Sequence, residues 1–167
     1  DWAKFYAMKT LQSNVVKAFN VEMLNRHAVM QNLKLQMNTN LPIYVIRTDV
    51  HSFFESIKHD RLFALIDRNS VLSVKSKEMT KNIIREYDRV KNAALVPKGQ
   101  GVPRGIGISS PLSEIYMADI DKEIKGRKEV IFYSRYVDDI LIILAYLPQQ
   151  MNLNKYYKEL ESKFNEE

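Results

Sequence analysis

Hydrophobic residues in the first part of the chain recur every three or four positions. Leu11, Val15, Phe19 and Met23 have this spacing within residues 2–38, a stretch with few helix-breaking residues. Side chains with this period lie on one face of a helix, so we expect helical structure there. The same criterion predicts three further amphipathic helices, over residues 60–68, 76–92 and 154–164.

Two helix starts have local capping signals. Asp60 is of a residue type that caps helices, so it is expected to cap the helix over residues 60–68. Ser110 followed by Pro111 predicts an N-cap and a first helical residue, beginning a helix that reaches about residue 125.

Three runs rich in β-branched and aliphatic residues predict strands. Residues 43–50 follow Pro42, and residues 129–136 and 140–147 form a candidate hairpin. Together with the helices, these runs predict an α+β fold in which a small antiparallel sheet packs on helices.

Composition limits the alternatives. A chain of 167 residues with 46% apolar content suits one domain. The net charge of +5 and a pI near 9.3 favour a polyanionic partner, although a generic basic surface explains them about equally well. The absence of cysteine excludes a disulfide framework, a zinc–thiolate site and a cysteine nucleophile.

Targeting signals are missing from these residues. The apolar run over 140–147 is too short to span a bilayer, so no membrane association is expected. The first residues lack a signal-peptide pattern and do not begin with Met, which indicates a fragment or a processed chain. A cysteine-free chain fits a reducing compartment, and we expect a cytoplasmic location.

Residues 97–110 form the one segment rich in Gly and Pro, and contain four of the five glycines. Such a segment predicts a loop whose backbone can approach a ligand closely.

Asp138 and Asp139 are adjacent carboxylates between two apolar strands, and Asp49 ends another. Like charges at contact distance raise each other's pKa unless a cation neutralises them, and hard divalent ions prefer carboxylate oxygens. Three acids at adjacent strand ends predict a site for two Mg²⁺, with Mn²⁺ as an alternative, suited to nucleotidyl transfer. The backbone carbonyl of Val50 is a candidate additional ligand. The plainer alternative is an ordinary two-residue turn, in which Asp is common.

Three segments, in order, resemble the palm motifs of reverse transcriptases. They are residues 49–59 (DVHSFFESIKH), residues 101–117 (GVPRG through ISSPL to IYM) and residues 136–139 (YVDD). The resemblance extends over residues 43–147. It implies a right-hand polymerase palm with part of the fingers and no thumb, and an enzyme that adds dNTPs to a 3′-hydroxyl with Mg²⁺. RNA or DNA template–primer and dNTPs are the partners that it implies.

The resemblance also implies roles for individual residues. Asp49, Asp138 and Asp139 match the catalytic metal ligands. Phe54 matches the bulky side chain that excludes a ribose 2′-hydroxyl. Further nucleotide contacts would come from the backbone around Ser52 and Phe53, and from Arg104, Gly105 and Tyr136. Alternation along a strand would put Phe53 and Phe54 on opposite faces, so that one of them is core.

Arg104 departs from the family pattern, in which glutamine is common at this place. The Pro-Arg-Gly sequence is similar to abortive-infection and other defence-associated bacterial reverse transcriptases, more than to group II intron or retron enzymes. It implies a role in anti-phage defence.

Other charged residues give weaker signals. Arg26 and Lys98 are candidates for phosphate contacts, against the default that basic side chains are simply exposed. A mixed-charge cluster over residues 121–129 is expected to be a solvated face. His51 and His59 lack metal-ligand spacing and are expected to be structural.

The implied organisation has five parts. They are partial fingers with the N-terminal helical region (1–42), a palm strand with the first acidic motif (43–60), fingers and palm helices (61–100), palm with Gly loop, helix and hairpin (101–147), and a C-terminal palm helix (148–167).

Two other functions remain open. An RNA-dependent RNA polymerase shares the palm and metals, but needs room for the 2′-hydroxyl that Phe54 would occupy. A non-catalytic nucleic-acid-binding scaffold would not need all three aspartates.

Overall fold

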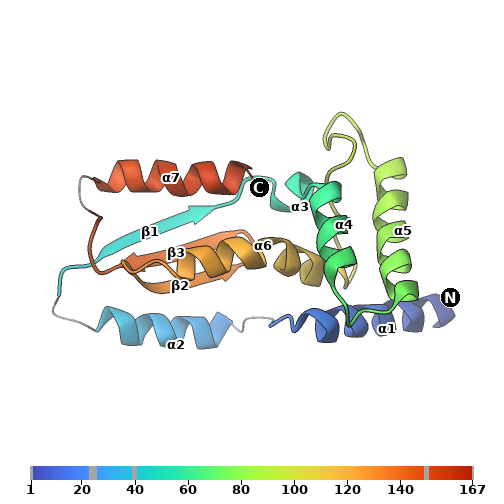
Figure 1. The fold of residues 1–167 in the computed structure, drawn as a ribbon, viewed down its shortest axis with the longest axis horizontal. Coiled ribbons are helices and arrows are strands. Elements are labelled where there is room, and N and C mark those ends of the chain that lie inside the picture. The colour runs from blue at the N-terminus through green and yellow to red at the C-terminus, as the bar shows by residue number, and fades with distance from the viewer. Residues whose placement is uncertain (1, 23–25, 39–40, 149–150, 167) are drawn as a thin grey trace. The chain divides into compact units, whose positions relative to one another are not determined.

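A computed structural model describes the chain except residues 1, 23–25, 39–40, 149–150 and 167, together with the side chains at positions 26, 165 and 166. The described residues form seven helices and one three-stranded sheet, which confirms the predicted α+β class (Figure 1). The chain divides into two compact units. Unit 1 comprises residues 1–23 and 52–117, and unit 2 comprises residues 24–51 and 118–167. No helix in the described part has the length and apolar character that crossing a bilayer requires.

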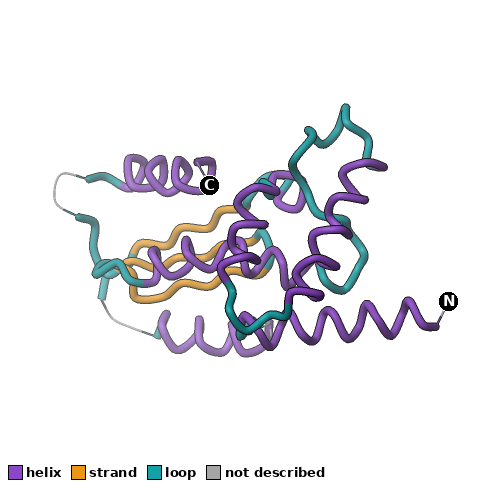
Figure 2. The backbone as a smooth tube through the Cα atoms, turned by 45° about the vertical axis from the view of Figure 1, so that its right-hand side comes forward, coloured by secondary structure: helices purple, strands orange, loops and turns teal. Residues whose placement is uncertain are grey.

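The sheet of unit 2 is antiparallel and has the order β1-β3-β2, shown in orange in Figure 2. Its strands are β1 (Tyr44–Asp49), β2 (Val130–Tyr136) and β3 (Asp139–Leu144). All three coincide with predicted runs to within a few residues. Because β3 is the central strand, it is paired along both sides and lies at the middle of the unit.

The helices of unit 2 are α2 (Arg26–Met37), α7 (Leu153–Glu166) and the last part of α6 (Ser109–Lys125). Ion pairs join α6 and the residues just after it to α7: Lys163 Nζ lies 2.6 Å from Glu123 and Arg127 lies 3.1 Å from Glu159. Ile124 of α6 and the β3 side chains Ile140 and Ile142 are all buried.

Unit 1 is helical. It contains α1 (Trp2–Phe19), α3 (Phe53–Ser56), α4 (His59–Arg68), α5 (Val74–Val90) and the first part of α6. Its core consists of buried aliphatic side chains from these helices and from the link between α3 and α4, including Leu11, Val15, Ile57, Leu62, Ile66, Ile84 and Leu112. Burial of such side chains is the main favourable term in folding.

The predicted helical region over residues 2–38 is interrupted. α1 ends because Asn20 adopts a left-handed conformation with φ 50°. The Asn20 N–H donates to the Lys17 carbonyl and the Val21 N–H to the Val16 carbonyl, which is the Schellman arrangement for ending a helix. Asn tolerates this conformation better than most residues, so the stop signal was present but was not recognised.

Two predicted caps are wrong. α4 begins at His59 with Lys58 as its N-cap. Asp60 lies in the first turn, where its negative charge stabilises the helix by interacting with the helix dipole rather than by capping. α6 begins at Ser109, one residue before the predicted cap Ser110, because the Ile108 carbonyl already accepts the first helical bond, from Leu112.

The short helix α3 was not predicted. Phe53 and Phe54 lie in it rather than in a strand, so the alternation argument for them is wrong. Phe53 is nevertheless buried and Phe54 half-buried, because adjacent residues of a helix also point in different directions.

Candidate active site

The three aspartates of the predicted metal site lie together in unit 2. Asp49 ends β1 and is the direct antiparallel partner of Asp139, the first residue of β3. Asp138 precedes it in the hairpin turn. These acids line one hollow of about 400 Å³ with Arg47 and Thr48. Side chains that are directly opposite on neighbouring strands project from the same face, and like charges there repel.

A cation already relieves part of this repulsion. Arg47 Nη2 lies 3.3 Å from Asp139 Oδ1, in an exposed ion pair. Among the described residues, no three acidic, His or Cys side chains converge closely enough to form a metal-binding group. The donor set still fits a hard divalent ion in its chemistry, because all three side chains offer carboxylate oxygens.

The turn that carries Asp138 has an uncommon backbone. Val137 adopts φ 60°, a left-handed conformation that is unfavourable for a β-branched residue. Such a conformation costs about 1–3 kcal/mol and persists only where the surroundings impose it. The Val50 N–H donates to the Asp138 carbonyl at 3.1 Å, which joins the turn to the residue after Asp49.

Arg135 holds the turn from its other side. Its Nη1 donates to the Val137 carbonyl at 2.9 Å, while Nε and Nη2 donate to the Asp121 carboxylate. Tyr133 donates its hydroxyl to the same carboxylate at 2.5 Å. Burial, followed by the Asp121 charge, raises the pKa of Tyr133. This network was missed in the sequence, where an Arg within an apolar strand was the available signal.

The mixed-charge cluster over residues 121–129 is therefore not simply a solvated face. Asp121 pairs with the buried Arg135, and Arg127 is only 14% exposed. Glu129 accepts a hydrogen bond from the buried Tyr156. These charges form structural links between α6, the sheet and α7.

In unit 1, the Gly/Pro-rich segment of residues 97–110, called the Gly loop below, lies against residues 54–59 of the first motif. The Val102 N–H donates to the Phe54 carbonyl at 2.9 Å, and the Gly101 N–H donates to the Ile57 carbonyl at 2.8 Å. His59, which is buried, bonds through Nε2 to the Gly101 carbonyl at 2.6 Å. His59 thus has the structural role expected of it.

A buried lysine fixes the start of the same loop. Lys91 Nζ donates to the carbonyls of Pro97 and Gln100 and forms a 2.6 Å ion pair with Asp88. Asp88 in turn accepts a hydrogen bond from the Gly99 N–H. The hydrogen bond from Lys91 lowers the pKa of Asp88 below its usual value.

Arg104 is held by an acid. Its guanidinium lies 2.7 Å from Glu55 and 5.8 Å from the centre of the Phe54 ring. Phe54 contacts Phe53, with 5.4 Å between ring centroids. Two residues that the sequence assigned to nucleotide contacts, Phe54 and Arg104, are therefore neighbours in unit 1. Glu55 was not singled out.

The remaining predicted residues have varied settings. Ser52 is the exposed, left-handed N-cap of α3, and its carbonyl accepts bonds from the backbone of Glu55 and Ser56. Gly105 is exposed with φ 82°, a conformation that favours glycine. Lys98 is exposed.

Tyr136 is exposed at the end of β2. It lines a hollow of about 160 Å³ with Asp139 and Arg47. Arg26 begins α2, and its side chain lies outside the described part of the chain.

Comparison with known proteins points in one direction. The sequence model of the family described as reverse transcriptase (RNA-dependent DNA polymerase) matches residues 5–167. No curated protein matches the chain. Members of the family are polymerases that act on template–primer and dNTPs and generally use divalent metal. Because the match extends over nearly all of its residues, the protein belongs to the reverse transcriptase family.

Proposed function

We propose that this protein adds deoxynucleotides to a 3′-hydroxyl, with Asp49, Asp138 and Asp139 as the catalytic metal ligands. The observation that carries the proposal is the register of the sheet, which pairs Asp49 with Asp139 at the end where Asp138 forms the turn. Such a concentration of negative charge opposes folding unless it serves to bind a cation.

The acids are well placed to act as fixed ligands. Asp49 and Asp139 come from paired strands. Asp138 comes from a turn in which the carbonyls of Val137 and Asp138 both accept hydrogen bonds. When bound, two Mg²⁺ ions would activate the attacking hydroxyl and neutralise the leaving pyrophosphate. The Val50 carbonyl is our candidate for an additional ligand. Arg47 would compete with a metal ion for Asp139 Oδ1.

Selection of deoxynucleotides is assigned to Phe54. A bulky side chain excludes a ribose 2′-hydroxyl by a clash, and it does so only if it cannot turn away. Support comes from the packing of the Phe54 ring, which contacts both the Phe53 ring and the Arg104 guanidinium. A ring restrained by such contacts meets this requirement.

Triphosphate contacts are assigned to Arg104 and to the backbone of Ser52 and Phe53. Arg104 offers a planar group with five donors, which suits phosphate oxygens. Its ion pair with Glu55 is part-exposed, so a triphosphate can compete for it. Gly105 and Tyr136 are assigned to the sugar and primer end.

RNA is the template we propose, in line with the family. For the biological setting we propose anti-phage defence in bacteria, on the similarity of the Pro103-Arg104-Gly105 sequence to defence-associated enzymes.

The test is nucleotide incorporation by the full natural chain. It is incubated with Mg²⁺ and labelled dNTPs or rNTPs, on primed RNA, primed DNA or no template. We expect incorporation of dNTPs on primed RNA. The variant Asp138→Asn/Asp139→Asn should lose it, since both substitutions preserve size and remove charge. Phe54→Ala should lower the preference for dNTPs over rNTPs at least tenfold, about the effect of a lost steric contact.

Asp119→Asn is the matched control, because Asp119 is an exposed acid of α6 away from the hollow. Its activity should equal that of the unmodified protein. Preferential incorporation of rNTPs would replace the proposal by RNA synthesis. Folded protein without incorporation on any template would replace it by a non-catalytic scaffold.

A further inference from the structure

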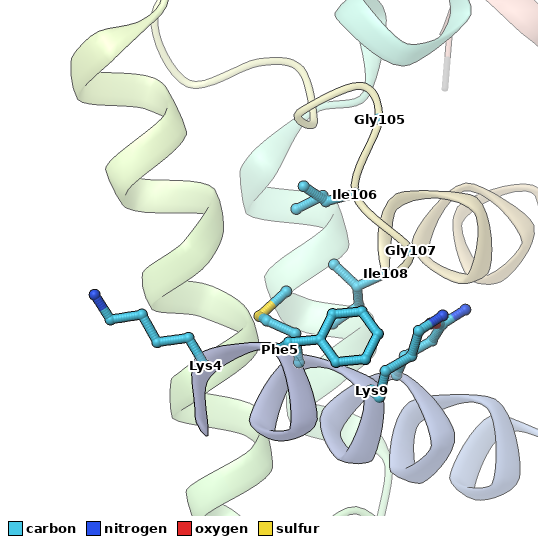
Figure 3. A pocket seen from close by; sticks show the side chains of 9 residues that line it. Lys4, Phe5, Lys9, Gly105, Ile106, Gly107 and Ile108 are labelled. Carbon is cyan, nitrogen blue, oxygen red and sulfur yellow. The ribbon is translucent and has the colours of Figure 1, made fainter. Parts of the chain in front are cut away.

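A second hollow, of about 390 Å³, lies within unit 1 between α1 and the Gly loop. Figure 3 shows Phe5 and Lys9 on the α1 side, with Ile106, Gly107 and Ile108 facing them from the loop. The rest of the lining comes from Lys4, Met8, Gln12 and Gly105. A concave, mostly apolar lining with a few polar side chains is typical of a site for a small ligand or a single ligand group.

Exposed aromatic side chains extend this lining along α1. Trp2, Phe5 and Tyr6 are 76%, 51% and 63% exposed, and their ring centroids lie 5.7–6.4 Å apart. Three aromatic rings so exposed on one helix are costly in water. They form a surface on which further flat π-systems can stack.

The charge of α1 has a single sign. The helix contains Lys4, Lys9 and Lys17 and no acidic residue. Lys9 Nζ lies 5.9 Å from the centre of the Phe5 ring, so one positive group accompanies the aromatic surface. By contrast, α5 mixes Lys and Arg with Glu and Asp. The ligand of the hollow is therefore expected to combine a flat ring with negative charge.

We propose that this hollow binds an unpaired nucleotide of single-stranded nucleic acid. The base would stack on Phe5, the Gln12 amide would bond to the base edge, and Lys4 and Lys9 would contact phosphates. Aromatic stacking with basic side chains is the usual chemistry of single-strand binding. A base in a duplex cannot enter, because its faces are already stacked.

The concave shape of the hollow favours a nucleotide over a lipid surface as its ligand. A lipid surface would be met by a convex apolar face, whereas this lining is a hollow that includes the polar residue Gln12. Gln12 lies so close to Gly107 that a Cβ there would come within 2.5 Å of its amide oxygen. Glycine at this position thus leaves room for the Gln12 amide.

This inference deepens the proposed function, because the bound strand would be a polymerase substrate, but its test does not need catalysis. Binding of short labelled oligouridine, oligothymidine and a duplex is measured by fluorescence anisotropy in EDTA, with the full natural chain carrying Asp138→Asn/Asp139→Asn. We expect single strands to bind more tightly than the duplex. The two single strands show whether RNA or DNA is preferred.

Two variants probe the hollow. Phe5→Leu keeps an apolar side chain and removes the ring, and should weaken single-strand binding about tenfold. Lys4→Gln/Lys9→Gln should weaken binding and reduce the slope of log affinity against log salt by about 0.7 for each lost phosphate contact. Photocrosslinking of a bromouracil-containing strand should label the α1 peptide.

Lys17→Gln is the matched control, since Lys17 is exposed on the same helix and does not line the hollow. It should retain binding. Unchanged binding by Phe5→Leu, or an equal loss in Lys17→Gln, would overturn the proposal in favour of diffuse charge attraction. Loss of binding to anionic vesicles in Phe5→Leu, without loss of strand binding, would overturn it in favour of a lipid surface. A protein that binds strands here yet incorporates no nucleotide would refute only the proposed function.

Discussion

Arg135 and Asp121 form a two-point ion pair that connects α6 to the turn containing Asp138. Nη2 lies 2.8 Å from Oδ2 and Nε lies 3.0 Å from Oδ1, and the two side chains are 2% and 15% exposed. The remaining nitrogen, Nη1, donates to the Val137 carbonyl. One side chain therefore fixes both the helix and the turn.

Replacing this arginine should affect stability and metal binding together. Arg135→Met removes the cation that pairs with the largely buried Asp121 carboxylate, so we expect the free energy of unfolding to fall by about 3–5 kcal/mol. The freed turn should weaken Mg²⁺ binding about 10-fold or more, as loss of a supporting residue commonly does. Urea unfolding and a Mg²⁺ titration measure the two effects.

Arg127→Met is the control for that variant, because Arg127 also pairs with acids but does not contact the turn. It should lower stability and leave Mg²⁺ affinity unchanged. Equal Mg²⁺ affinity in the Arg135→Met and Arg127→Met proteins would show that Arg135 has no positioning role.

Val137→Gly should relieve strain in the turn. Glycine adopts the φ of 60° found at Val137 without steric cost. Within a strand, by contrast, replacing Val by Gly removes a favourable side chain. We expect the free energy of unfolding to stay level or rise by up to about 1 kcal/mol. In Val45→Gly, on an exposed position of β1, it should fall by a similar amount. A larger loss at Val137 than at Val45 would contradict the strain argument.

Arg47 should compete with metal for Asp139. Arg47→Gln removes the 3.3 Å ion pair and leaves two facing carboxylates without a cation. We expect tighter Mg²⁺ binding, by a few-fold, because an exposed ion pair contributes up to about 1 kcal/mol. Thermal unfolding at rising Mg²⁺ measures it, since a ligand of the folded state raises the melting temperature. Weaker binding in Arg47→Gln would assign Arg47 a supporting role instead.

Ionisation of Tyr156 should lower the stability of the folded protein in alkaline solution. Burial raises the pKa of Tyr156 from 10.0 to about 12, with Arg127 opposing and Glu129 reinforcing the shift. The folded protein therefore retains the proton that the unfolded chain loses. The resulting stabilisation is complete below pH 10 and is lost as pH rises towards 12.

Tyr156→Phe should lower stability at neutral pH, because the hydrogen bond to Glu129 is lost, and should flatten the decline between pH 10 and 12. Some dependence of stability on pH should remain in this variant, because the pKa of Tyr133 is also raised. Urea unfolding across this pH range provides the measurement, and an unchanged slope in Tyr156→Phe would refute the assignment.

Local sequence was enough to predict the strands and the clustering of the three aspartates at their ends. The runs around Asp49 and Asp139 are strongly apolar and short, and the polymerase motifs fix their order, so an antiparallel pair with acids at one end followed directly. The helix over residues 60–68 was also predicted closely, because its apolar period is strong.

Features that depend on contacts distant in sequence were not predictable from it. Asp121 looked like one charge among many, and only its approach to Arg135 shows its role. Arg104 was predicted to contact the nucleotide, but in the structure it pairs with Glu55, which lies 49 residues away in the sequence. The turn strain at Val137 is a backbone property that residue types do not reveal.

The pairing of β1 with β3 has a consequence for how the protein is made. Arg47 and Asp139 are 92 residues apart, so β1 must wait for a long intervening stretch to be synthesised before it can pair with β3. Closing so long a loop is slow compared with forming a local helix. On the ribosome, a nascent chain would thus fold its early helices first. The edge of the sheet that carries Asp49 and Asp139 would form only after β3 has emerged, and a product terminated before β3 would lack the proposed metal site.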